Sequence, residues 1–421
     1  MVELLWGIHR PSDCNENSGF DIVIGNPPYL EARSSEFSEE MKSSIQAEIK
    51  QKRPSAAKSF PRGADLLIFF YELSLRLLNS TGYNVFITEN AWLSTDYGKM
   101  FQNFLQDQCR VHAVIDSDYK YFETANINTI ITFFQNKTEI QESAPIRFFH
   151  CLGSLEKYPC NTFSHNSTEN VLLKEINTHD PIVKDNKWGF VFSADEEILQ
   201  LLKVLFDNED YHLSKRVSIG QGLNITKNHI LKQAGINTVP YFTSENGATY
   251  TWECADSYVL ADIASANRKK PRLILPRGIG THFCCINNCE GYSASYVEVY
   301  GELVEEEILK IWLFCNSSLL WLLRELTGRT NLGGGMLKAE ATDLKGIPLC
   351  YDFDVEKILP LYTALRGRKL NTNLLATLID PDHLALDRLV LSSLGLEDSL
   401  SYIVTSLTDR VSIRTNKSKT K

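Results

Sequence analysis

The sequence predicts an α/β fold, in which an open sheet is followed by a second domain of mixed helices and strands. Short apolar runs rich in β-branched residues recur in the first third of the chain, and amphipathic helical patterns separate them. Polar residues stand at the ends of these runs, where open sheets of this class place their ligands. The length of 421 residues provides a core for each of about two or three domains.

Composition and charge restrict the partners that we expect. The formal net charge of −9 argues against a protein that coats nucleic acid by charge alone, so any such partner must meet a local basic surface. No apolar run is long enough for a transmembrane helix, and the start does not have the pattern of a signal peptide. The ten cysteines have no regular spacing, which predicts reduced thiols rather than a disulfide framework. We therefore expect a cytoplasmic protein without a membrane partner.

The first predicted strand, Phe20 to Ile24, is followed by a turn whose residue types are suited to catalysis. Gly25 and two prolines stop the strand, because proline cannot join a sheet ladder. Pro27 and Pro28 stiffen the turn. The Asn26 side-chain oxygen and the Pro27 carbonyl could then accept hydrogen bonds from one planar –NH₂ group and stabilise the positive charge that develops when it attacks. Tyr29 offers a flat face on which a flipped base could stack. The alternative is a Pro-Pro turn without chemistry.

The segments after the turn continue the predicted alternation of helices and strands. Residues 31–61 are polar and charged and predict a mobile loop over the site. A helix opens at Gly63-Ala64-Asp65, and its apolar face comprises Leu66, Phe69, Phe70, Leu73 and Leu77. The predictions that follow it are a strand at Tyr83–Thr88 with Glu89-Asn90 at its carboxyl end, a helix through Tyr97 to Leu105, and neighbouring antiparallel strands at Val111–Asp116 and Thr129–Phe134.

Asn-Pro-Pro-Tyr after a hydrophobic strand resembles the catalytic motif of S-adenosylmethionine-dependent amino-methyltransferases. The segments Arg62–Leu66, Val85–Leu93 and Tyr121–Thr129 follow it as in adenine-N6 DNA methyltransferases of restriction–modification systems. The resemblance implies the C-terminal half of a doubly wound class I methyltransferase (Rossmann-like) sheet. It also implies that Phe122, or alternatively Tyr121, packs on the flipped adenine opposite the tyrosine of the turn. The alternative for Phe122 is a loop aromatic that plugs the edge of the core.

The rest of the chain divides by composition. We predict a partial catalytic domain at 1–150, a linker at 151–190, a mixed α+β target-recognition domain at 191–351 and a helical extension with a basic tail at 352–421. The order of segments in the third part resembles the specificity domain of TaqI-like methyltransferases, which implies double-stranded DNA as partner.

The stretch Arg268–Arg277 is the most basic in the chain. From it we expect Lys269, Lys270, Arg272 and Arg277 to contact DNA phosphates, the alternative being a solvated edge strand protected by charge. His282-Phe283-Cys284-Cys285 with Cys289 lacks a Cys-x-x-Cys pair, so we expect no metal there.

The family pattern is incomplete at one point. S-adenosylmethionine is normally held by a Gly-rich turn after the first strand, and only about twenty residues precede Phe20. Asp65 is a candidate for a cofactor contact. We expect that a second polypeptide supplies the cofactor-binding half, or that the chain is a truncated, inactive DNA-binding remnant. An RNA-base or protein-glutamine methyltransferase, which shares the motif, is the remaining alternative.

Overall fold

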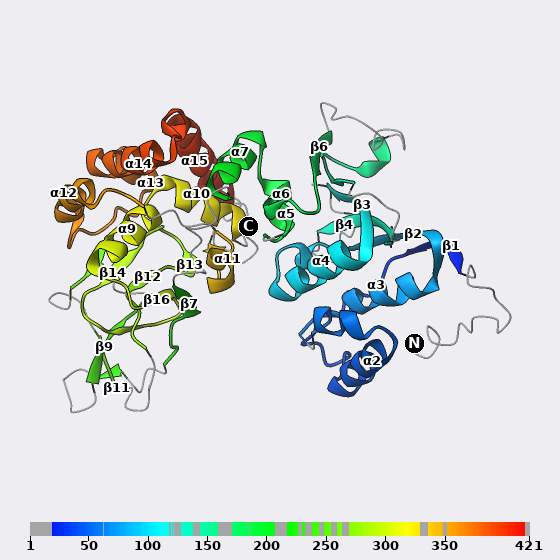
Figure 1. Ribbon diagram of the computed structural model, residues 1–421. Helices are drawn as coiled ribbons and strands as arrows, with labels where there is room; N and C mark the ends of the chain where they lie inside the picture. Colours follow the sequence, from blue (N-terminus) through cyan, green and yellow to red (C-terminus); the bar gives the residue numbers. More distant parts are fainter. Residues whose placement is uncertain are drawn as a thin grey trace. The chain divides into compact units, whose positions relative to one another are not determined.

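The computed structural model divides into two compact units, Met1–Asp195 and Glu196–Lys421 (Figure 1). The described residues are 19–61, 63–117, 119, 121, 128–137, 144–158, 171–184, 186–206, 217–225, 230–231, 238–243, 248–253, 259–262, 269–328, 336–347 and 352–416.

The first unit contains a six-stranded mixed sheet in the order β1-β2-β4-β3-β5-β6 (Figure 1). β1 is parallel to β2 and β3 is parallel to β5, whereas β4 is antiparallel to both of its neighbours and β6 is antiparallel to β5. The strands are β1 Phe20–Gly25, β2 Leu78–Glu89, β3 Cys109–Ser117, β4 Thr129–Asn136, β5 Ile146–Cys151 and β6 Val171–Ile176.

The predicted α/β fold is confirmed, and so is the antiparallel pairing of the third and fourth predicted strands, which are β3 and β4. β2 is longer than predicted, since it begins directly after the preceding helix. β5 begins at the end of the predicted catalytic domain, and β6 lies in the segment 151–190 that we predicted as a linker. β6 pairs with β5, so the predicted linker in fact adds the last strand of the sheet.

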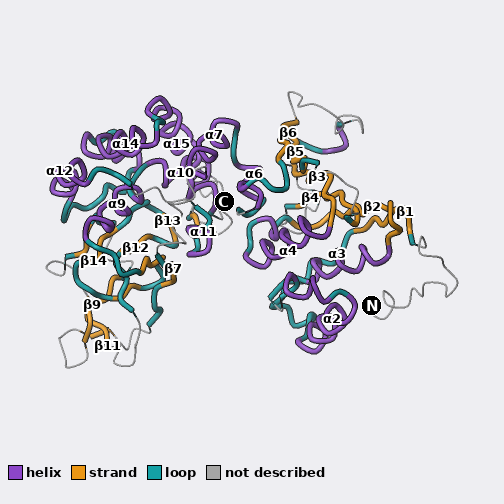
Figure 2. Tube along the Cα trace, viewed as in Figure 1, coloured by secondary structure: helices purple, strands orange, loops and turns teal. Residues whose placement is uncertain are grey.

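Helices α3 (Leu66–Leu77) and α4 (Asp96–Gln108) cover one face of this sheet (Figure 2). Tyr71 of α3 has its ring 5.1 Å from that of Phe86 on β2 and 4.8 Å from that of Phe101 on α4. Side chains of β2 alternate accordingly: Asn84, Phe86 and Thr88 are buried, while the residues between them are partly or fully exposed. Within the described part of the chain, one face of β2 is therefore buried and the other is partly exposed.

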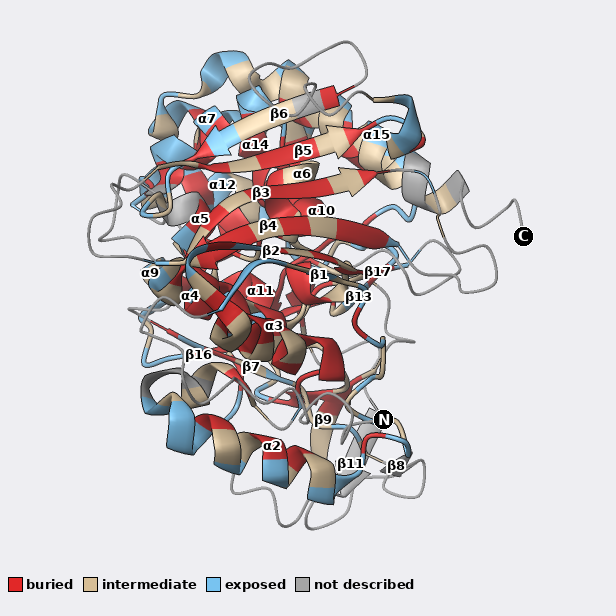
Figure 3. Ribbon diagram, turned by 90° about the vertical axis from the view of Figure 1, so that its right-hand side faces the viewer, coloured by how far each residue is buried: buried red, intermediate tan, exposed pale blue. Residues whose placement is uncertain are grey.

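β1 is the outermost described strand on its side of the sheet. Phe20, Ile22 and Ile24 are 51%, 62% and 76% exposed, which is unusual for side chains of a hydrophobic strand. Figure 3 shows the contrast with β3, β4 and β5, which are drawn mostly as buried.

The prediction of a mobile loop at residues 31–61 is wrong. Helix α2 (Glu39–Lys52) occupies this stretch, and the Ser38 hydroxyl caps it by accepting a hydrogen bond from the Met41 amide. Ile45 and Ile49 are buried on one side of α2, and Phe60 is buried beyond it against Phe104 of α4, with ring centroids 4.9 Å apart. These apolar side chains hold the segment in place.

Shorter elements complete the first unit. They are 3₁₀ turns at Pro54–Ser59, Ala91–Leu93 and Leu155–Lys157 and helices α5 (Pro181–Lys184) and α6 (Gly189–Ser193).

The second unit combines small sheets with a helical layer. Its sheets have the strand orders β10-β14-β12-β16-β7, β15-β9-β11-β8 and β13-β17. The strands are β7 Ser218–Gln221, β8 Ile230–Leu231, β9 Thr238–Phe242, β10 Thr251–Trp252, β11 Val259–Asp262, β12 Leu273–Leu275, β13 Gly278–Ile279, β14 Cys285–Asn287, β15 Tyr292–Ser293, β16 Val297–Tyr300 and β17 Leu337–Lys338. The helices are α7 Glu196–Phe206, α9 Glu305–Cys315, α10 Ser318–Thr327, α11 Ala341–Lys345, α12 Val355–Leu365, α13 Leu374–Leu378, α14 Pro381–Leu394 and α15 Leu400–Asn416.

The predicted helical block at 303–326 is confirmed as two helices, α9 and α10. They are separated at Asn316-Ser317, where the Ser317 hydroxyl caps α10 by accepting from the Leu320 amide. The predicted helical extension is present as α12 to α15, and the end of the basic tail lies outside the described residues. No helix in the described residues has the length and apolarity needed to cross a membrane.

Candidate active site

The Asn-Pro-Pro-Tyr turn lies beside the carboxyl end of β2. In the parallel register Gly25 pairs with Phe86, so the turn that follows runs next to the last residues of β2. The Tyr29 hydroxyl donates to the Ile87 carbonyl at 3.4 Å. Pro27 is buried, whereas Asn26 and Pro28 are exposed. The turn is thus fixed at one point and presents its amide side chain outward.

Asp65 ties the chain after the turn to the start of α3. One carboxylate oxygen accepts from the Ala32 amide at 2.8 Å, and the other accepts from the Tyr97 hydroxyl. The Leu66 amide also donates to the Leu30 carbonyl at 2.9 Å. Asp65 is 8% exposed and both oxygens are engaged, so its contacts favour positioning of the turn over the cofactor contact that we had predicted.

Glu89, the last residue of β2, brings a second acidic group to this end of the sheet. Burial, together with the nearby Asp65 and Glu31, raises the pKa of Glu89 to about 7. Burial and the neighbouring Glu89 likewise raise the pKa of Tyr29 to about 12. Burial also raises the pKa of Tyr97, an effect that Asp65 and Glu89 reinforce. Tyr29, Glu31, Asp65, Glu89 and Tyr97 therefore form an interacting group of acids and phenols around the turn.

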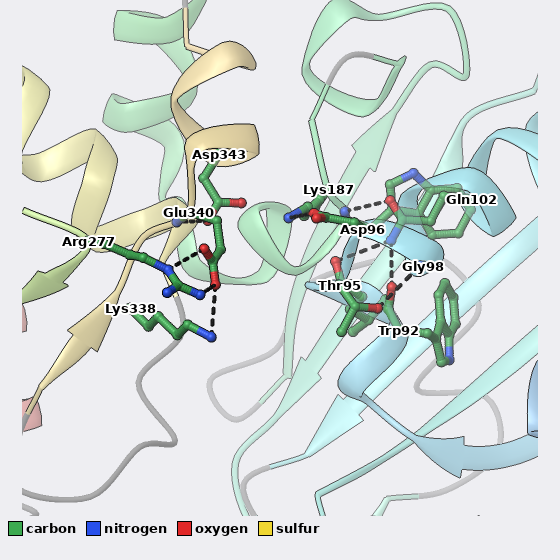
Figure 4. A network of polar contacts seen from close by, with 12 residues as sticks. Trp92, Thr95, Asp96, Gly98, Gln102, Lys187, Arg277, Lys338, Glu340 and Asp343 are labelled. Carbon is green, nitrogen blue, oxygen red and sulfur yellow. Dashed lines mark hydrogen bonds and ion pairs between the residues drawn. The ribbon is translucent and has the colours of Figure 1, made fainter. Parts of the chain in front are cut away.

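The chain just beyond Glu89 is held by α4, as the right-hand group of Figure 4 shows. The Gln102 side-chain amide donates to the Trp92 carbonyl at 2.9 Å, and the Gly98 amide donates to the Thr95 hydroxyl at 3.2 Å. A Cβ at Gly98 would lie 1.8 Å from the Trp92 carbonyl oxygen, so only glycine allows this approach. These contacts fix the exit from β2 and with it the position of Glu89.

Of the two residues predicted to stack on the base, the structure describes Tyr121 and not Phe122. Phe122 lies outside the described residues. The Tyr121 hydroxyl accepts a hydrogen bond from the Leu155 amide, and its ring is 5.1 Å from that of Tyr119. Tyr121 is thus engaged in local packing, and the stacking role stays a prediction.

The predicted DNA-binding residues lie in the second unit. The described side chains of Lys270, Arg272 and Arg277 each form an ion pair with a carboxylate. Lys270 Nζ is 3.2 Å from Glu290, and the Arg272 guanidinium is 2.9 Å from Glu305. The side chains that form these pairs are largely exposed. Lys269, Lys270 and Arg272 line a surface cavity of about 540 Å³. Arg268 lies outside the described residues.

Arg277 is held differently, as the left-hand group of Figure 4 shows. Its guanidinium donates twice to Glu340, at 2.6 and 2.9 Å, and Lys338 lies 2.8 Å from the same carboxylate. Burial would raise the pKa of Glu340, but the hydrogen bonds from Arg277 and Lys338 outweigh it and lower this pKa to about 2. The Arg277 guanidinium therefore joins the residue before β13 to the segment after β17.

The cysteine-rich segment has structural partners. His282 Nε2 is 2.7 Å from Glu325, and Cys284 and Cys285 are buried free thiols. Cys289 is disulfide-bonded, so the expectation of reduced thiols throughout is wrong at this position. The described residues contain no group of three or more acidic, histidine or cysteine side chains arranged to hold a metal ion.

The glycine pairs of the described residues do not form a cradle for S-adenosylmethionine. Gly278 begins β13 and Gly280 directly follows this strand, with no helix between them and β14. A Cβ at Gly222 would lie 1.9 Å from the Ala294 carbonyl oxygen, so close packing explains this glycine. The described residues therefore do not by themselves form a binding site for S-adenosylmethionine.

Comparison with known proteins relates this site to a family. Residues 4–122 match the family described as Eco57I restriction-modification methylase. The Type II methyltransferase M.BstVI of Geobacillus stearothermophilus is 32% identical over 113 residues, which are 27% of this chain and 18% of that protein. The Type II restriction enzyme and methyltransferase RM.Eco57I of Escherichia coli is 27% identical over 125 residues, which are 29% of this chain and 12% of that protein. The matched part thus covers only a small share of either relative.

Solved structures of restriction–modification enzymes are similar over more of the chain. The Type IIL enzyme MmeI, solved in complex with DNA, has a TM-score of 0.49 and 11% identity, covering 94% of this chain and 57% of its own. The type IIG restriction endonuclease BpuSI has a TM-score of 0.41 and 13% identity, covering 96% of this chain and 55% of its own. Likeness at this level carries no conclusion about function.

The sequence match includes β1, the Asn-Pro-Pro-Tyr turn, α3, β2 and α4, which are the elements that build the site. Residues 4–122 of this chain are therefore similar to the Eco57I restriction-modification methylase family.

Proposed function

We propose that this chain supplies the target-base site and the DNA-contacting domain of an adenine-specific DNA methyltransferase in a restriction–modification system. The reaction is methyl transfer from S-adenosylmethionine to the N6 amine of an adenine flipped out of the duplex. The observation that carries the proposal is the Asn26–Tyr29 turn at the end of β1, fixed against β2 inside the segment that matches the methylase family.

The residues of the turn act by binding and orienting the base. Asn26 is exposed, so its side-chain oxygen is free to accept one amine hydrogen, and the Pro27 carbonyl accepts the other. Two acceptors draw the nitrogen toward tetrahedral geometry and stabilise positive charge on it. Tyr29 lies half-buried with its hydroxyl tied to β2, which leaves its ring as the stacking face, and Phe122 is the proposed partner on the other side.

DNA backbone contact is proposed for the basic segment of the second unit. Lys269, Lys270 and Arg272 are the proposed phosphate contacts, since they gather at one exposed cavity. Arg277 is better suited to a structural role, because both arms of its fork are bonded to Glu340.

A second polypeptide, or a further part of a longer protein, is the proposed source of the cofactor-binding half. The exposed apolar side chains of β1 support this, because an uncovered hydrophobic edge strand favours association. The compartment that we propose is the cytoplasm, where the DNA of a restriction–modification system lies.

The main rival function is methylation of an RNA base or a protein glutamine, since the motif serves those amines as well. The helical and β-rich second unit, Glu196–Lys421, argues against it, because such enzymes seldom carry a domain of this size. The non-enzymatic rival is a DNA-binding remnant that has lost the cofactor half.

Substitution of Asn26 tests the proposal. The chain is expressed together with the neighbouring reading frames of its locus, and methylated nucleosides are measured in the DNA. We expect Asn26→Ala to reduce N6-methyladenine by about a hundredfold or more, the scale seen when one charge-stabilising group is removed. DNA binding should stay within about twofold. Asn26→Asp, which keeps an acceptor oxygen, serves as the matched control and should retain part of the activity.

Loss of DNA binding together with methylation in Asn26→Ala would contradict the assigned role. Methylation found in RNA or on a protein glutamine instead of DNA would favour the rival.

A further inference from the structure

The proposed base site contains a carboxyl group that the reaction described above does not use. Within the part of the chain that the structure describes, the Glu89 side chain makes no hydrogen bond or ion pair, yet Glu89 ends the strand that runs beside the Asn26–Tyr29 turn. It pairs with Thr129 of β4 on the side away from β1. A half-buried carboxyl group without a partner is costly unless it is neutral or has a ligand to bind.

The position of Glu89 is defined from both sides. The strand pairing of Gly25 with Phe86 places residues 26–29 alongside the end of β2, and the Tyr29 hydroxyl bonds to the Ile87 carbonyl two residues before Glu89. On the other side, the Asn90 amide donates to the Asn128 carbonyl at 2.9 Å. The pairing of β2 with β1 and β4 therefore fixes the position of Glu89 next to the Asn26–Tyr29 turn.

The groups that face Glu89 favour its protonated form. Burial raises the pKa of Glu89, and Asp65 before α3 and Glu31 on the chain after β1 raise it further, to about 7. The phenols of Tyr29 and of Tyr97 on α4 are the other titratable groups that interact with it. None of these neighbours is a cation, so nothing in this group stabilises the Glu89 carboxylate.

A protonated carboxyl group complements the other edge of the base. The Asn26 side-chain oxygen and the Pro27 carbonyl are the acceptors for the amine, and the two amine hydrogens occupy both of them. The ring nitrogen next to the amine, which is N1 in adenine and N3 in cytosine, is an acceptor and needs a donor. An acid O–H is such a donor, and it lies on the strand adjacent to the acceptors.

We propose that protonated Glu89 donates a hydrogen bond to the ring nitrogen beside the amine that the Asn26–Tyr29 turn receives. The ligand is thus a flipped amino-heterocycle with an unprotonated ring nitrogen next to its amine, such as adenine. This inference rests on the proposed function and assigns a donor to the ring nitrogen of the base. It makes recognition of the base depend on pH, because only the acid form donates.

The test uses duplexes with one unpaired base, which exposes a base without knowledge of the recognised sequence. Affinities of the full chain are measured for duplexes with an adenine bulge, a 1-deazaadenine bulge, a purine bulge and a cytosine bulge. 1-Deazaadenine keeps the amine but lacks the N1 acceptor, and purine keeps N1 but lacks the amine. Measurements are made at pH 6 and pH 8, on either side of the transition expected for Glu89.

For the unaltered chain we expect adenine to bind about threefold to tenfold more tightly than 1-deazaadenine at pH 6, the range for one hydrogen bond. The preference should fall to about twofold or less at pH 8. Glu89→Gln should keep the preference at both pH values, since its amide donates independently of pH. Glu89→Ala should lose it at both.

Two results overturn the inference: a preference for adenine over 1-deazaadenine that is equal at both pH values in the unaltered chain, or a Glu89→Gln variant that keeps the pH dependence. Failure of the proposed function has a different signature, which is equal binding of adenine and purine bulges. Tighter binding of cytosine than adenine would keep the Glu89 contact and reassign the base.

Discussion

Burial and the neighbouring carboxylates favour the protonated form of Glu89, which is also the form that the proposed contact with the base requires, and this preference is measurable at the scale of one residue. Burial and two nearby carboxylates hold its pKa near 7 in the folded chain, whereas an unfolded glutamate has a pKa of about 4.3. The folded state therefore holds a proton that the unfolded state releases between these two values. Stability contributed by Glu89 is fully present below about pH 4 and is lost as the pH rises to about 7.

Replacing Glu89 by Gln removes this loss. We expect Glu89→Gln to be more stable than the unaltered chain by about 1 kcal/mol at pH 8, after allowance for solvent screening of a partly exposed group. The difference should shrink toward zero near pH 4. Urea unfolding followed by tryptophan fluorescence at a series of pH values measures it. A stability difference that does not change with pH would show that Glu89 is not held protonated.

At the scale of elements, the β1–β2 pair decides whether the turn is positioned at all. Gly82 lies within β2 where β1 approaches closely, and a Cβ there would lie 2.5 Å from the Phe20 carbonyl oxygen. Two backbones cannot accommodate that contact without moving apart. The site therefore depends on a glycine that is distant from the turn along the chain.

Gly82→Ala should loosen β1 without touching the chemistry of the turn. We expect amide hydrogen exchange in residues 20–25 to accelerate by about tenfold or more, which corresponds to roughly 1.4 kcal/mol of local stability. Gly63→Ala is the matched control, since a Cβ there meets nothing within 4 Å. Equal exchange in the two variants would show that the β1–β2 approach is not the constraint.

The basic segment of the second unit offers a second test among the elements. Replacing Lys269, Lys270 and Arg272 by Gln should weaken duplex binding and reduce the dependence of log affinity on log salt by about 2 to 3, near one unit per phosphate contact. A triple variant of Glu290, Glu302 and Glu305 to Gln, which removes acidic residues from the same cavity, should do the reverse. An unchanged salt dependence in the variant of the basic segment would indicate a solvated edge strand that does not contact DNA phosphates.

Elements with strong periodicity were predictable from the sequence, and those defined by long-range contacts were not. The strand before the turn, α3, β2 and the β3–β4 pair follow from apolar runs and helical spacing. α2 was missed because its buried face is narrow, with Ile45 and Ile49 inside a charged run, although Ser38 followed by two glutamates was a usable cap signal. β6 was missed because its pairing with β5 is invisible in local composition.

The site shows the same division. The turn residues were predictable because their types define the chemistry. The contacts of Asp65 with Ala32 and Tyr97 join three separate segments, so a local sequence pattern does not predict them. The carboxylates that pair with Lys270 and Arg272 lie about twenty and thirty residues further along the chain, so the sequence showed a basic stretch where the structure has ion pairs.

At the scale of the whole molecule, the question is what covers β1. The proposal of a separate cofactor-binding half requires a surface on which it docks, and Ile22 and Ile24 are the most exposed apolar residues of that strand. Apolar side chains at an edge strand favour pairing with a further strand.

Ile24→Lys should therefore prevent association with a polypeptide that supplies the missing half. We expect co-purification of the chain with products of the neighbouring reading frames to fall by about tenfold or more. Ile379→Lys is the control, because this isoleucine is 72% exposed and lies in the second unit, in the loop before α14. Unchanged co-purification of Ile24→Lys would contradict β1 as the docking edge.

The identity of the methylated base tests the central claim most directly. DNA from cells that express this chain with its neighbouring reading frames is digested to nucleosides and analysed by mass spectrometry, beside DNA from cells that express Asn26→Ala in the same context. The account predicts N6-methyladenine in the first sample and its loss in the second. Methylation of cytosine alone, or N6-methyladenine that persists in Asn26→Ala, would contradict it.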